Sequence, residues 1–132
     1  MPINHSYLFT HTVIDIDKLL SGTHNEYRVV STRRYSDKKG ILPEGISVTL
    51  QIIKDDIDYG YTKTGEPREN NLYQNFDVTI LDASLSLAKG DIIQLIDFVP
   101  EHSFAVGFDL LLRFKSAKVL KPAEAKGTKA NA

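Results

Sequence analysis

Apolar and polar residues alternate along most of this chain, and that alternation constrains its fold more than any other feature. The clearest run is Ile46 to Ile53, where every second residue is apolar: Ile46, Val48, Leu50 and Ile52. A period of two places such residues on one face of a β-strand, whereas a helix needs a period near 3.6. The run therefore predicts a strand with one face in a core and the other face open to solvent or a ligand.

The same alternation predicts further strands, separated by turn residues. The expected strands are Phe9 to Ile16, Tyr27 to Arg34, Ile46 to Ile53, Leu72 to Leu81, Asp91 to Val99, and Phe104 to Leu120 as one long strand or a pair. Thr64-Gly65 is typical of a hairpin tip, and Asp17 to Asn25 carries a turn signal. Asp82 to Lys89 is the one helix candidate, because Asp82 can cap it and Gly90 can end it.

Strands with turn-rich joints and a single short helix indicate an all-β sandwich or barrel. A barrel is favoured because closure leaves no sheet edge exposed. Residues 1–120 are expected to form this one domain, and its core should include the phenylalanines in phase with the apolar period: Phe76, Phe98, Phe108 and Phe114. After Leu120 the composition turns to Lys, Ala, Gly, Thr and Asn, so residues 121–132 are expected to be a flexible basic tail.

Composition indicates the cellular compartment in which this chain is expected to function. There are no cysteines, so we expect neither disulfides nor thiolate metal sites. No apolar stretch approaches the roughly 18 residues of a membrane helix, and Met1 to Thr10 lacks the pattern of a signal peptide. These features predict a cytoplasmic protein with no membrane partner.

Basic residues gather in two stretches although the formal net charge is only −1. From Tyr27 to Lys39 the chain has five basic residues and one acidic residue, and from Arg113 to Ala132 it has six and one. Such runs either bind a polyanion or keep a face solvated. The sequence leaves both interpretations open.

Three segments, taken in order, resemble the single-stranded-DNA-binding proteins of the OB fold. They are the strand Ile46 to Ile53, the long polar loop Asp55 to Asn71 that leads through Tyr73 and Phe76 into the next strand, and the run Leu87-Ala-Lys-Gly-Asp-Ile-Ile-Gln-Leu95. The chain is also similar to small accessory proteins of conjugative plasmids and transposons from Gram-positive bacteria. The resemblance implies a five-stranded OB-type barrel, with the short helix between its third and fourth strands.

The chain differs from that family in two respects. It has no Trp, on which the family often stacks bases, and its tail is basic where the family has an acidic, proline-rich tail. These differences argue against a role as the cell's principal single-strand binder.

Binding of a single strand requires cations that follow the phosphates and flat side chains on which bases stack. The chain interleaves the two kinds of residue. We expect phosphate contacts from a set of six basic residues: Arg33, Arg34, Lys38, Lys39, Lys63 and Arg68. We expect bases to stack on four tyrosines: Tyr35, Tyr59, Tyr61 and Tyr73.

Each of these assignments has a structural alternative. Tyr59 and Tyr61 could close one end of the barrel, and outward residues such as Arg113 could belong to a solvated face. Three aspartates beside the long loop would repel phosphate unless they point away or bind a cation: Asp55, Asp56 and Asp58.

No catalytic constellation can be assembled from the sequence. The four histidines lack zinc-ligand spacing, no serine occupies a Gly-x-Ser-x-Gly elbow, and no Gly-rich phosphate loop is present. We therefore expect no enzyme activity, no metal and no cofactor. The predicted function is binding of single-stranded DNA, with RNA as an alternative ligand, with little sequence preference and in plasmid transfer or replication. The alternative is a non-catalytic assembly module of a phage or conjugative element, whose outer strands would form a homo-oligomer.

Overall fold

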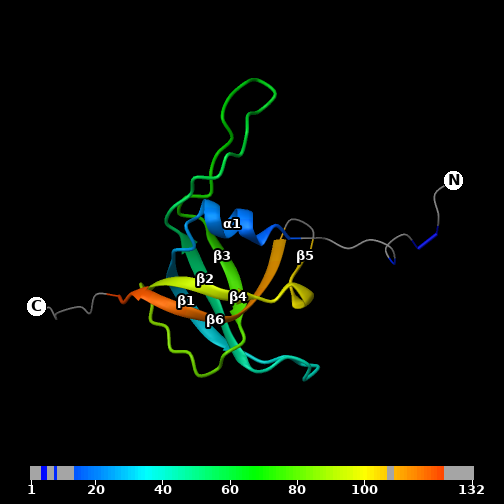
Figure 1. The fold of residues 1–132 in the computed structure, drawn as a ribbon, viewed down its shortest axis with the longest axis vertical. Helices are drawn as coiled ribbons and strands as arrows, with labels where there is room; N and C mark the ends of the chain where they lie inside the picture. Colours follow the sequence, from blue (N-terminus) through cyan, green and yellow to red (C-terminus); the bar gives the residue numbers. More distant parts are fainter. Residues whose placement is uncertain (1–3, 6–7, 9–13, 107–108, 124–132) are drawn as a thin grey trace, which may run out of the picture.

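The computed structural model describes residues 4, 5, 8, 14–106 and 109–123 (Figure 1). One short helix precedes six strands. The elements are α1 (Ile16–Gly22), β1 (Tyr27–Tyr35), β2 (Gly45–Ile52), β3 (Asn75–Ile80), β4 (Ile92–Phe98), the 3-10 turn η2 (Pro100–His102), β5 (Phe104–Val106) and β6 (Asp109–Lys121). The prediction of a mostly β chain is confirmed.

The six strands form one sheet in the order β3-β2-β1-β4-β6-β5. Neighbours in this order run antiparallel, and a further parallel pairing joins β3 to β6. The β3–β6 pairing joins two strands that the order places far apart, so the sheet closes partly into a ring. Figure 1 shows α1 lying across one end of that ring.

The predicted first strand, Phe9 to Ile16, is wrong where the structure describes it. Residues 9–13 lie outside the described residues, whereas Ile16 begins α1. The side chain of Asp15 accepts a hydrogen bond from the Lys18 amide (3.1 Å), which caps the helix at the start of the stretch expected to be a turn. Ile16, Leu19 and Leu20 have helical spacing and pack against the core, and this packing selects the helix.

The predicted helix between the third and fourth strands is also wrong. Residues 82–90, all of them described, contain two turns joined by irregular backbone and no helix. The Asp82 carboxylate accepts hydrogen bonds from the amide (3.0 Å) and hydroxyl (2.6 Å) of Ser84, which satisfies it in a turn. Leu85 and Leu87 both pack against the core, and a spacing of two fits extended backbone better than a helix.

The core fills the ring with side chains from five strands. Its fully buried members are in phase with the alternation that the sequence shows: Val29, Val48, Leu50, Ile80, Ile93 and Phe114. Phe114 is a core residue as predicted, Phe76 and Phe98 are half-buried against the core, and Phe108 lies outside the described residues.

Tyr27 is fully buried at the end of the core beneath α1. Its hydroxyl lies 2.6 Å from the Thr23 hydroxyl, which in turn donates to the Leu19 carbonyl at the end of α1. Burial raises the pKa of Tyr27 to about 12, although the hydrogen bond with Thr23 acts in the opposite direction. These contacts join α1 to β1.

The connection between β2 and β3 includes a hairpin that stands away from the body, which we call the arm (residues 59–70; Figure 1). Tyr61 and Pro67 form a bridge across it, and the Thr62 amide donates to the Glu66 carbonyl (2.8 Å). Gly65 has φ +85°, so the predicted tip at Thr64-Gly65 is confirmed.

The stretch expected to be a basic tail begins inside the sheet. Lys121 is the last residue of β6, and the Ala123 amide donates to the Asp91 carboxylate (2.7 Å). Residues 124–132 lie outside the described residues. None of the described helices is long and apolar enough to cross a membrane.

Candidate nucleic-acid interface

Three rows of polar side chains cross the outer face of the sheet. The strand registers align Arg28 with Gln51 and Asn75, Ser31 with Thr49 and Asp77, and Arg33 with Ser47, Thr79 and Arg113. The residues that alternate with them on β2 and β3 point into the core. The sequence therefore makes a polar outer face on β1, β2 and β3, with arginines along its β1 edge.

A cleft opens beside these rows, where β3 and β6 separate. The two strands pair only at Val78–Ile80 and Leu112–Phe114, and before Leu112 strand β6 pairs with β5 instead. The cleft has a volume of about 670 Å³, within the usual range for ligand sites. Its lining combines side chains of the polar rows with apolar side chains of β3 and β6, among them Phe76 and Leu110.

Arg113 is fixed in the wall of this cleft. Its Nη1 donates to the His102 carbonyl (2.5 Å) and its Nη2 donates to the Tyr35 hydroxyl (3.3 Å). The guanidinium carbon lies 5.8 Å from the ring centres of both Tyr35 and Phe104. Its Nε is buried without a hydrogen-bond partner in the described part of the chain. Arg113 thus connects β1 with the β5–β6 hairpin, and of the two rings that it contacts, Tyr35 lines the cleft.

The loop between β1 and β2 is ordered by Asp37. Its carboxylate accepts hydrogen bonds from the amides of Leu42, Lys39 and Ile41, at 3.0 to 3.2 Å. These bonds lower the pKa of Asp37, with a smaller contribution from the charge of Arg113. Lys38 and Lys39 are exposed in this loop, which follows directly after Tyr35.

The predicted phosphate contacts divide between the two faces of β1. Arg33 and Tyr35 line the cleft. Arg34 lies opposite Ile46, and Ile46 packs against the core. The Arg34 side chain is therefore on the opposite face of β1 from Arg33 and Tyr35. The structure therefore brings Arg33 and Tyr35 together and separates Arg34 from them.

Tyr59 is held at the base of the arm. Its hydroxyl donates to Asp55 Oδ2 (2.7 Å) and accepts from Asn71 Nδ2 (3.0 Å). Partial burial and the contact with Asp55 raise the pKa of Tyr59. Burial alone would raise the pKa of Asp55, but hydrogen bonds from Tyr59, Asn71 and Ile57 outweigh it and lower that pKa. Tyr59 thus braces the base of the arm.

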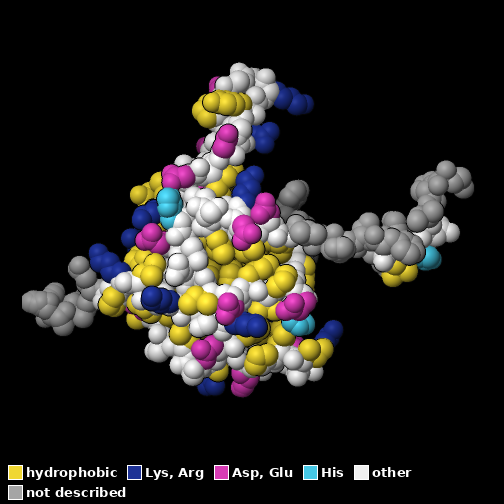
Figure 2. Space-filling model, in the orientation of Figure 1, with side chains coloured by type: hydrophobic (Ala, Val, Ile, Leu, Met, Phe, Trp, Pro, Cys, Tyr) yellow, Lys and Arg dark blue, Asp and Glu magenta, His cyan; other side chains and the backbone are white. Residues whose placement is uncertain are grey.

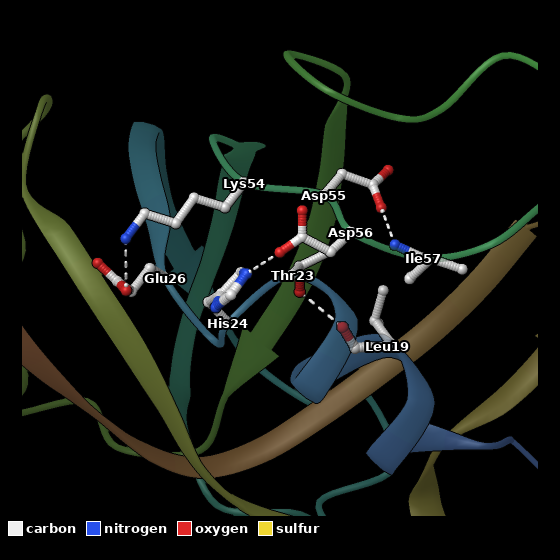
Figure 3. Close-up of polar contacts among 8 residues, drawn as sticks. All are labelled: Leu19, Thr23, His24, Glu26, Lys54, Asp55, Asp56 and Ile57. Carbon is white, nitrogen blue, oxygen red and sulfur yellow. Dashed lines mark hydrogen bonds and ion pairs between the residues drawn. The ribbon is translucent and has the colours of Figure 1, made fainter.

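The aspartates near the arm are engaged in local contacts (Figure 3). The Asp56 carboxylate is hydrogen-bonded to Nε2 of His24, which follows α1, and the neighbouring Lys54 forms an ion pair with Glu26 at 3.0 Å. The Asp55 carboxylate also accepts from the Ile57 amide (3.1 Å), and Asp58 accepts from the Gly60 amide (2.8 Å). These carboxylates fasten the loop to itself and to α1.

The remaining predicted residues of the loop are exposed. Tyr61, Lys63 and Arg68 lie on the arm, and Figure 2 shows its basic side chains on one side. Tyr73 lies at the foot of the arm with 64% of its surface exposed. Its amide donates to the Ile52 carbonyl (2.7 Å), and its carbonyl accepts from Gln51 Nε2 (3.3 Å). Tyr73 therefore stands beside the row that contains Arg28.

Tyr73 adopts a backbone conformation that bulky residues avoid. Its φ is +68°, in the left-handed region that favours glycine. Strain of this kind persists only where the surrounding structure fixes it, and it is enriched at functional sites. Here the bond from the Tyr73 amide to the Ile52 carbonyl and the bond from the Gln51 side chain to the Tyr73 carbonyl hold the conformation and leave the ring exposed.

Several residues of this interface were not singled out by the sequence. Arg28 and Arg113 join the rows through strand register, and Phe104 reaches Arg113 from β5. Asp77 and Asp109 also line the cleft, so its lining includes two carboxylates as well as two arginines. The alternation in the sequence placed Arg113 on the outer face of its strand. Its neighbours in the polar rows follow only from the pairing of β3 with β6.

Comparison with protein-family models, with curated proteins and with solved structures found no match for this chain. Among the described residues, no group of three or more His, Asp or Glu side chains could hold a metal ion.

Proposed function

We propose that this protein binds single-stranded nucleic acid, DNA in the first place, along the outer face of β1, β2 and β3, without chemistry on it. The observation that carries the proposal is the continuity of that face. Tyr73 stands at one end, polar rows cross the middle, and Arg33 and Tyr35 lie at the other end beside the cleft. Cations for phosphates and exposed rings for bases are the two components that such binding needs.

The strand connections support an OB-type barrel as the framework. An OB barrel has five strands, and it binds oligonucleotides on the face of strands 2 and 3 and with two flanking loops. Here β1, β2 and β3 form an antiparallel meander, β4 pairs with β1, and β6 pairs with both β4 and β3. In this plan β5 is an addition, and the flanking loops contain Lys38 and Lys39 on one side and Phe104 on the other.

The charges around the cleft indicate how a strand would lie. The cleft wall carries Arg33 and Arg113 but also Asp77 and Asp109, so it offers no net positive charge to a phosphate. Phosphates would instead follow a basic rim outside the cleft that consists of Arg28, Lys38 and Lys39, together with the exposed Arg33 where β1 borders the cleft. Three or four such contacts give a slope of log affinity against log salt of about −2 to −3, because each contributes about −0.7 for a single strand.

Neighbouring residues of β1 provide the test and its control. Affinity for a labelled mixed-sequence single strand is measured by fluorescence anisotropy at several salt concentrations. Arg33→Ala should make the salt slope shallower by about 0.7, whereas Arg34→Ala, with the same change in charge on the other face, should leave it unchanged. Equal effects of the two variants, or no binding by the unaltered protein, would contradict the proposal.

An assembly module remains the second candidate, and a specific observation favours it. The β5–β6 hairpin exposes three large apolar side chains by 43 to 46%: Phe104, Leu110 and Leu111. Exposed apolar clusters often mark contacts between proteins. Sedimentation over a range of concentrations separates the candidates. Self-association that Leu110→Lys abolishes, in a protein that binds no single strand, would favour assembly.

A further inference from the structure

We propose that the cleft between β3 and β6 accepts a nucleobase with an exocyclic amino group, and that Asp77 selects it. This inference rests on the proposed function, and it replaces the expectation of little sequence preference with a defined one. Cytosine, adenine and guanine carry such an amino group, whereas thymine does not.

The first step is the orientation of the Asp77 carboxylate. Asp77 is exposed on the outer face of β3, directly opposite Thr49 of β2. The Thr49 hydroxyl donates to Asp77 Oδ1 at 2.5 Å. Its Oδ2 has no hydrogen-bond partner among the residues that the structure describes, so one oriented acceptor remains at the cleft.

The second step is the choice between phosphate and base. Asp77 and Asp109 both line the cleft, and an ionised carboxylate repels a phosphate but accepts hydrogen bonds from a base. Arg33 lies one row further along the same face, where it can meet the backbone at the rim. The charges therefore favour a base inside the cleft and its phosphate outside.

The third step is the identity of the base. At the same ring position cytosine presents an amino donor and thymine presents a carbonyl acceptor. A carboxylate can accept a hydrogen bond from the amino group of cytosine. It cannot form a hydrogen bond with the carbonyl group of thymine, because both groups offer only lone pairs. The apolar lining of the cleft, which includes Phe76 and Leu110, can cover the face of either ring. The choice between the two bases therefore depends on the polar edge of the base that meets Asp77.

The pyrimidine pair gives the sharpest test. Binding of labelled oligodeoxycytidine and oligothymidine of about 15 nucleotides, within the footprint of such barrels, is compared by anisotropy at mildly alkaline pH. Oligodeoxycytidine should bind roughly tenfold more tightly than oligothymidine, a difference within the range of discrimination that a polar contact with a base edge provides. Asp77→Asn should reduce this ratio to below about twofold, because an amide can serve either base as donor or acceptor.

The control is Asp97→Asn on β4. It makes the same change in net charge, Asp97 is exposed, and its φ of +59° suits Asn. This variant should keep the tenfold ratio, and thermal unfolding of both variants should show that they remain folded.

Each result decides the matter. Equal binding of the two oligomers by the unaltered protein would overturn this inference and leave the proposed function standing. A preference for cytosine that survives in Asp77→Asn would overturn the role of Asp77. Absence of binding to either oligomer would overturn the proposed function and this inference with it.

Discussion

Replacement of Tyr73 separates the cost of its backbone conformation from the use of its ring. A side chain in the left-handed region costs about 1–2 kcal/mol, a cost that Asn largely avoids. Only about a third of Tyr73 is buried, since 64% of its surface is exposed. One third of the roughly 200 Å² that a tyrosine can bury, at about 25 cal/mol per Å², gives a lost contact of about 1.7 kcal/mol. The two terms nearly cancel, so Tyr73→Asn should change the free energy of unfolding by less than about 1 kcal/mol.

The affinity for a single strand should respond much more strongly. Loss of one stacked base costs about 1–3 kcal/mol, which corresponds to a fall in affinity of about 5- to 150-fold. Tyr73→Phe should keep the affinity because the ring remains, whereas Tyr73→Leu should lose it while retaining the backbone strain. Denaturant unfolding and fluorescence anisotropy on the same four proteins measure both quantities. An unchanged affinity in Tyr73→Asn would refute the reasoning.

Two further predictions concern the fold that carries this face. Gly45→Ala should reduce the free energy of unfolding by more than about 3 kcal/mol and lower the unfolding temperature sharply, because the new Cβ would lie 2.1 Å from the Ile80 carbonyl oxygen. An unfolding temperature within a few degrees of that of the unaltered protein would contradict the packing of β2 against β3. Tyr27→Phe should cost about 1 kcal/mol near neutral pH, from the lost bond to Thr23. Burial raises the pKa of Tyr27 from 10.0 to about 12, so the unfolded state loses the phenol proton at a lower pH than the folded state does. The stability that the buried phenol contributes is therefore complete below about pH 10 and should fall as the pH rises toward 12. Urea unfolding across that range should show a steeper loss for the unaltered protein than for Tyr27→Phe, and equal losses would contradict the burial of the hydroxyl.

The strands were predictable because burial on one face imposes a period of two. Val48 and Leu50 of β2 and Val78 and Ile80 of β3 are buried in the phase that the sequence shows. The tip at Thr64-Gly65 was predictable because glycine is suited to a positive φ.

The two helix errors have one physical cause, which is tertiary packing. The seven residues of α1 are too few to be stable alone, so contacts of Leu19 and Leu20 with the core select that helix. Between β3 and β4 the core contacts of Leu85 and Leu87 select extended backbone instead, although Asp82 and Gly90 suit a helix.

The interface depended on topology that no local pattern contains. Arg33 and Arg34 are neighbours on a predicted strand, so the period of two already places them on opposite faces, but only the register of β1 with β2 shows that Arg33 is the one in the polar rows. Tyr35 and Arg113 meet because the ring brings β1 and β6 to one cleft, 78 residues apart in the chain. Basic runs in the sequence therefore indicated a region of β1 but could not identify its partners.

The most direct test of the proposed binding face is a titration of the labelled protein with a short single strand, followed by the chemical shifts of its backbone amides. The largest shifts are expected on β1, β2 and β3 at the polar rows, at Tyr73, and in the loop that contains Lys38 and Lys39. Shifts confined to β4 and the β5–β6 hairpin, or no shifts at any ratio of strand to protein, would contradict the assignment of this face to nucleic acid.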